Sequence, residues 1–81
     1  MTAELIEKFV ESGDVTGKPV TISFKQRNNI TGVFVQGHDY TEMKKKNFWR
    51  IVSETKLAEW KKSNDMNLAR IFNGSEFTKL K

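Results

Sequence analysis

Alternating apolar and polar residues predict the first two strands of a small sheet. In a predicted strand of about 19–26, Val20, Ile22 and Phe24 alternate with polar residues, which is the period of a half-buried strand. A second apolar run covers 30–36 and contains Gly32, and a glycine inside a strand often marks a bend or a close backbone approach. The polar residues between the runs, 26–29, predict a turn, because Asn tolerates the left-handed conformation.

The N-terminal segment has helical spacing instead. Its apolar residues lie three and four positions apart and form one stripe: Ala3, Leu5, Ile6, Phe9 and Val10. Thr2 can cap the N-terminus and Gly13 can end the helix. We therefore predict a helix over 2–12 that buries this stripe, followed by a connector over 14–18.

The second half of the chain predicts three more strands. The first, about 47–54, carries apolar residues on both faces, which indicates that it is covered on both sides. The others, 68–73 and 77–80, flank the tight-turn signal Asn73-Gly74-Ser75.

Two segments between the strands are less regular. Residues 37–46 are polar and basic and predict a loop. Residues 55–62 fit either a helix or an extension of the third strand; we predict a short helical turn, followed by a turn at 63–65.

The order of these elements indicates an α+β, mostly β fold. An N-terminal helix precedes a small, five-stranded, strongly bent antiparallel sheet, and a strand covered on both faces suits a bent barrel better than a flat sheet. Eighty-one residues make one domain, 1–81, with the helix at 2–12 and the barrel at 18–81.

The composition of the chain limits the kinds of chemical site and partner that we expect. The chain has no cysteine and one histidine, which argues against disulfides and zinc sites and fits a reducing, cytoplasmic environment. We expect no signal peptide, no membrane span and no cofactor. Lys and Arg number 14 against 10 Asp and Glu, and the net charge of +4 is compatible with a polyanionic partner.

Two segments resemble motifs of the Sm-like family, the small barrels of Sm and LSm proteins and of the RNA chaperone Hfq. Residues 71–80 resemble the second motif, with Asn73 where Sm and LSm proteins usually have Arg. Residues 32–39, followed by Met43 and Asn47, resemble the first motif, with Asp39 one residue late and three lysines separating Met43 from Asn47. SH3-like barrels can mimic this pattern.

The resemblance implies an RNA-binding barrel that assembles into rings. The positions that contact RNA bases in the family correspond to a set of polar residues in this chain: His38, Asp39, Asn47 and Asn73. Independently, a cluster of cations lies beside Tyr40, Phe48 and Trp49: Lys44, Lys45, Lys46 and Arg50. Cations neutralise phosphates and aromatic rings stack on bases, so this basic and aromatic segment is a candidate RNA site.

Other functions leave weaker signals. His38 and Asp39 are adjacent and do not form a nucleophile, base and orienting group, and no nucleophile motif is present, so we expect no enzyme. The alternative to RNA binding is an interaction or structural module that forms homo-oligomers through the barrel edges. Phe72, Phe77 and Trp60 can serve such an interface, although core packing is the favoured interpretation for each. Phe48 and Trp49 cannot both face outward from one strand, so we expect at least one of them in the core.

Overall fold

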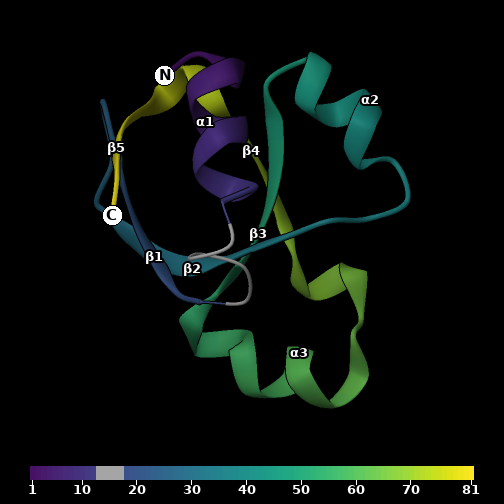
Figure 1. The fold of residues 1–81 in the computed structure, drawn as a ribbon. Coiled ribbons are helices and arrows are strands. Elements are labelled where there is room, and N and C mark those ends of the chain that lie inside the picture. The colour runs from purple at the N-terminus through teal and green to yellow at the C-terminus, as the bar shows by residue number, and fades with distance from the viewer. Residues whose placement is uncertain (13–17) are drawn as a thin grey trace.

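A short helix lies over one face of a five-stranded antiparallel sheet (Figure 1). In this computed structural model, residues 1–12 and 18–81 are described. The strands are β1 (Val20–Phe24), β2 (Ile30–Val35), β3 (Phe48–Ser53), β4 (Arg70–Asn73) and β5 (Phe77–Leu80). The helices are α1 (Ala3–Val10), α2 (Tyr40–Lys45) and α3 (Leu57–Ser63), with 3₁₀ turns η1 (Glu54–Lys56), η2 (Met66–Leu68) and η3 (Gly74–Glu76).

The sheet has the order β4-β3-β2-β1-β5, and every neighbouring pair is antiparallel. The prediction of a leading helix and five antiparallel strands is thus confirmed. The barrel prediction is not, because the sheet remains open: β4 and β5 are its two edges, and the strands described here do not close it. Both edge strands are only four residues long, so each edge exposes few unpaired backbone N–H and C=O groups.

Helix α1 is shorter than predicted and buries a narrower stripe. The Thr2 hydroxyl caps it by accepting a hydrogen bond from the Leu5 amide at 3.3 Å, as expected. Ile6 and Val10 are buried and Phe9 is half-buried, but Leu5 is 55% exposed, so its predicted burial is wrong. The predicted helix end at Gly13 and most of the predicted connector lie outside the described residues.

The main core lies between α1 and the sheet. Seven strand residues pack there with Ile6 and Val10: Val20, Ile22, Phe24, Trp49, Ile51, Phe72 and Phe77. The core interpretation of Phe72 and Phe77 is therefore confirmed, whereas Trp60 is half-buried and lies outside this core.

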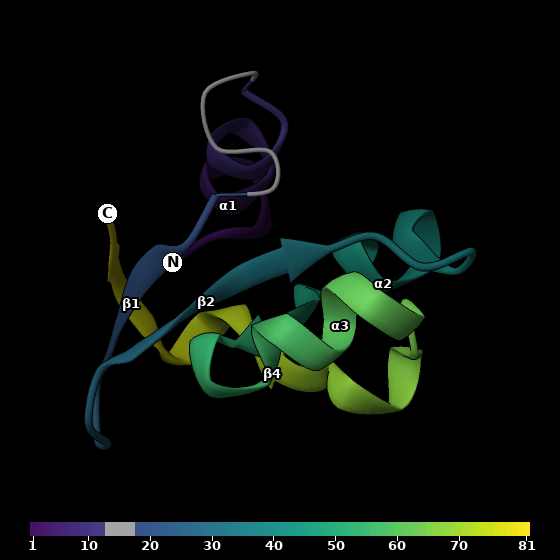
Figure 2. The same cartoon turned by 90° about the horizontal axis from the view of Figure 1, so that it is seen from below.

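The opposite face of the sheet carries a second, smaller buried region. Val33 and Val52 face each other across β2 and β3, are almost fully buried, and stand outside the main core cluster. Helix α3 contacts β3, and α1 and α3 lie on opposite sides of β2 (Figure 2). This arrangement confirms that the third strand is covered on both sides, and that the ambiguous segment 55–62 is helical.

Gly32 permits the close packing of β2 on β3. A Cβ atom at this position would lie 2.6 Å from the backbone carbonyl oxygen of Val52. Since that neighbour is backbone, it cannot move aside as a flexible side chain would. The glycine in the second strand therefore marks a close backbone approach, one of the two meanings that its position predicted.

The segment 37–46, predicted as a loop, contains helix α2. None of its six residues is buried, so it lacks the apolar stripe by which a helix is recognised in a sequence. Contacts with other elements hold it: the Tyr40 ring packs edge-on against Trp49, with ring centroids 6.1 Å apart, and the Tyr40 hydroxyl donates to Glu11 at the C-terminal end of α1. Among the described residues, no helix combines the length and apolar character needed to cross a bilayer.

Candidate functional site

The predicted basic segment is partly neutralised by α1. The Lys44 ammonium lies 3.2 Å from the Glu7 carboxylate and 3.3 Å from that of Glu11, and the Tyr40 hydroxyl donates to Glu11 at 2.8 Å. The hydrogen bond from Tyr40 lowers the pKa of Glu11, and the bond to Glu7 raises the pKa of Lys44. Burial, with the Glu11 carboxylate beside it, raises the pKa of Tyr40. Lys44 therefore fastens α2 to α1 and offers little charge to a phosphate.

Arg50 is also paired inside the protein. Its guanidinium forms an ion pair with Asp39, and the resulting hydrogen bond lowers the pKa of the Asp39 carboxyl. His38, Lys45 and Lys46 are exposed, and the ion pairs found in the described residues do not include either lysine.

Asn47 joins three parts of the fold. Its backbone is left-handed, with φ 62°, which Asn adopts more readily than most residues. Its side-chain amide donates to the Met1 carbonyl at 3.1 Å and accepts from the Trp49 indole at 2.8 Å, while its own carbonyl accepts from the Gly74 amide at 2.7 Å. Asn47, which the family resemblance predicts to contact RNA, is therefore engaged in hydrogen bonds that link parts of the fold.

The two adjacent aromatic residues of the segment, Phe48 and Trp49, differ in solvent exposure. Trp49 is 1% exposed and belongs to the core, whereas Phe48 is 37% exposed. The expectation that at least one of the two is core is confirmed. Phe48, Lys45 and Lys46 are the parts of the predicted RNA segment that remain open to a ligand.

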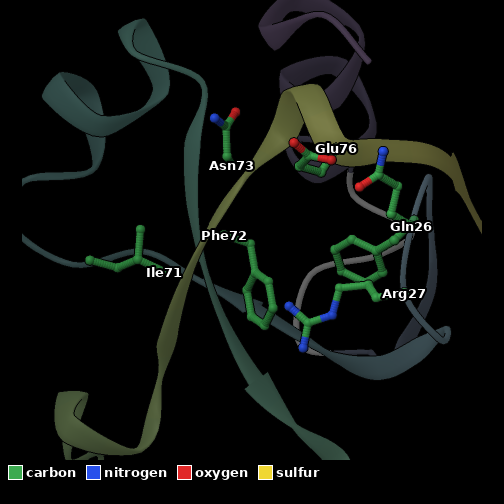
Figure 3. Close-up of a pocket in the computed structure, with 7 residues that line it drawn as sticks. Gln26, Arg27, Ile71, Phe72, Asn73 and Glu76 are labelled. Atoms are coloured by element: carbon green, nitrogen blue, oxygen red, sulfur yellow. The ribbon is translucent and has the colours of Figure 1, made fainter.

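A different site lies beside the edge strand β4. A groove with a cavity volume of about 350 Å³ opens between β4, the end of β1 and η3, and we call it the edge groove (Figure 3). Its lining residues are Phe24, Gln26, Arg27, Ile71, Phe72, Asn73 and Glu76. The volume is within the range of small-ligand sites, roughly 300–1,000 Å³.

Cations and aromatic rings stack at one end of the edge groove. The centroids of the Phe24 and Phe72 rings lie 5.7 Å apart, and the Arg27 guanidinium lies over both, at 5.2 and 5.5 Å from their centroids. The Arg70 guanidinium lies 5.7 Å from the Phe72 ring. Figure 3 shows Arg27 beside Phe72, while Ile71 points away from them. Arg27 therefore gives this end of the groove a positive charge and a flat guanidinium surface, and Arg70, which does not line the groove, adds a second charge beside it.

The other end of the edge groove is polar. Figure 3 places Gln26 and Glu76 together there. Asn73 also lines the groove, and its side-chain oxygen accepts from the Ser75 amide at 3.0 Å and so caps η3. The amide of Lys25 donates to the Glu76 carbonyl at 2.9 Å and holds the end of β1 against η3. Of the sequence-predicted site residues, only Asn73 belongs to this groove.

Sequence reasoning missed Arg27, Arg70 and Glu76 as site residues. Arg27 stands in a polar turn and Arg70 at the start of a strand, positions where a lone cation is ordinary solvated surface. The chemical options are limited as well: within 1–12 and 18–81, no group of three His, Asp or Glu side chains is placed to hold a metal ion. The edge groove is suited to binding a planar, polar ligand.

Comparison of the chain with models of protein families, with curated proteins and with solved structures gives no match.

Proposed function

We propose that this protein is a non-enzymatic RNA-binding domain, a relative in architecture of the small Sm-like or SH3-like barrels, that holds single-stranded RNA across the edge groove. The observation that carries the proposal is the stacking of Arg27 and Arg70 on the groove's aromatic rings. The Phe24 and Phe72 rings are themselves buried, so the stacking face open to a ligand is the Arg27 guanidinium. Single-stranded RNA is bound by such surfaces, because guanidinium planes stack on unpaired bases while the positive charge attracts phosphates.

The basic segment has a secondary part in this proposal. Lys45 and Lys46 are exposed beside Phe48, so they can contact the backbone of a strand that extends beyond the groove. Lys44 and Arg50 are held by carboxylates and contribute less. The cytoplasmic location expected from the sequence stays a prediction.

The test compares three double variants that each remove two positive charges. Fluorescence anisotropy of a labelled single-stranded RNA gives the affinity at several salt concentrations for Arg27→Gln/Arg70→Gln, for Lys45→Gln/Lys46→Gln, and for the control Lys61→Gln/Lys62→Gln on α3. We expect the groove variant to lose the most affinity, and the slope of log K against log salt to fall by about 0.7 per lost contact.

Two results would refute this function. One is the absence of RNA binding by the wild-type protein at low salt. The other is an equal loss in all three double variants, which would indicate non-specific attraction to net charge. Melting temperatures must accompany the titrations, because the stacked guanidinium of Arg27 can contribute about 0.5–1 kcal/mol to folding.

Self-association is a second candidate function, favoured by the open sheet. Strands β4 and β5 are both edges, and Ile71 on β4 is 56% exposed, so the β4 edge of one copy can pair with the β5 edge of another. Light scattering over a range of protein concentrations measures the mass, and Ile71→Lys should lower it if β4 is an interface. A monomeric mass at every concentration would exclude this candidate.

A further inference from the structure

The polar end of the edge groove carries a carboxylate without a partner. Glu76 lines the groove, and the hydrogen bonds and ion pairs found within 1–12 and 18–81 leave its carboxylate unengaged. The nearby cations form no ion pair with it, because the guanidiniums of Arg27, in the groove, and Arg70, beside it, lie over aromatic rings instead. Glu76 is exposed and its carboxylate repels phosphate, so a ligand group that lies against it is favoured when it presents N–H donors.

The base edges differ in how they can meet this demand. Guanine has two adjacent donors on its Watson–Crick edge, N1–H and N2–H₂. Adenine, cytosine and uracil have single donor groups, each next to an acceptor. An ionised carboxylate has two acceptor oxygens and can accept both guanine donors at once, in the paired geometry that makes charge-assisted hydrogen bonds strong.

We infer that the edge groove selects guanine, with Glu76 accepting from N1–H and N2–H₂ while the base stacks on the Arg27 guanidinium. The inference rests on the proposed function, which brings RNA into the groove, and adds to it the base that is read there.

The experiment uses four labelled pentanucleotides that differ only at the central base. UUGUU is compared with UUIUU, in which inosine lacks only the N2 amino group, and with UUAUU and UUUUU, by anisotropy at low salt. We expect the wild-type protein to bind UUGUU about 5- to 150-fold more tightly than UUAUU, since a bidentate contact discriminates by about 1–3 kcal/mol. UUIUU should lose a large part of this preference.

Glu76→Gln tests the carboxylate directly. The variant keeps the shape of the side chain but has one acceptor oxygen, so the preference for guanine should fall to nearly none while affinity for UUUUU is retained. The side chain is exposed, so the fold should tolerate the change. Glu59→Gln, the same change at an exposed site on α3, should keep the preference.

The outcomes separate the two proposals. If all four oligonucleotides bind equally and Arg27→Gln/Arg70→Gln weakens them all, the guanine inference is wrong and the RNA-binding function stands. A Glu76→Gln variant that keeps the wild-type preference would likewise overturn the inference. If no pentanucleotide binds, both proposals fail.

Discussion

Replacing Asn47 separates a structural role from a role in RNA recognition. The resemblance to Sm-like proteins predicts a base contact at this position, whereas the structure shows the side chain bonded to the Met1 carbonyl and the Trp49 indole. If the structural role dominates, the main effect of Asn47→Ala should be a lower stability of the fold, and RNA affinity can be interpreted only after that loss is measured.

The magnitude follows from two terms. Trp49 is 1% exposed, and leaving its buried indole N–H without an acceptor costs about 1–3 kcal/mol. Alanine at φ 62° costs a further 1–2 kcal/mol or so, because its Cβ crowds the backbone in the left-handed conformation. The sum, about 2–5 kcal/mol, is a large part of the stability of a small domain, typically about 5–15 kcal/mol.

Two companion variants separate these terms. Asn47→Gly removes the side-chain bonds but accepts the backbone conformation, so it should be more stable than Asn47→Ala. In a Trp49→Phe background the buried indole N–H is gone, and Asn47→Ala should then cost less by about the desolvation term. Urea unfolding followed by circular dichroism measures all five proteins: the wild type, Asn47→Ala, Asn47→Gly, Trp49→Phe and Trp49→Phe/Asn47→Ala.

One outcome would refute the reasoning. If Asn47→Ala unfolds within about 0.5 kcal/mol of the wild type, as ordinary surface substitutions do, then the side chain is not a structural link. A loss of RNA affinity at unchanged stability would then favour the base contact that the family resemblance predicts.

Two further predictions concern packing and pH. Ile6→Ala should lower stability by about 2–5 kcal/mol, because Ile6 is fully buried, whereas Leu5→Ala on the exposed side of α1 should cost about 0.5 kcal/mol or less; equal losses in thermal melts would mean that α1 docks differently. The Arg50 hydrogen bond lowers the pKa of Asp39, so this carboxyl contributes stability that is present above its unfolded pKa of about 3.9 and is lost as the pH falls through its folded pKa. Asp39→Asn should therefore flatten the fall in melting temperature below about pH 4, and an unchanged acid profile would contradict the ion pair.

The sequence determined by itself those elements that depend on neighbouring residues. The alternation in β1, the stripe and cap of α1, and the Gly32 in β2 each show their physical cause within a few positions. This local information is enough to give the number, order and type of the strands and the antiparallel class. It also placed Trp49 or Phe48 in the core, because adjacent residues of a strand face opposite sides.

Only the tertiary structure decided what depends on distant partners. Helix α2 has no buried stripe and is held by α1 and Trp49, so its own residues predict a loop. Lys44 and Arg50 read as free cations until their carboxylate partners, on α1 and before α2, are placed beside them. The edge groove joins residues 24–27 to residues 71–76, because the sheet order brings β1 and η3 together from opposite ends of the chain. No pattern of neighbouring residues predicts this groove, because the groove depends on which strands pair and where the sheet stays open.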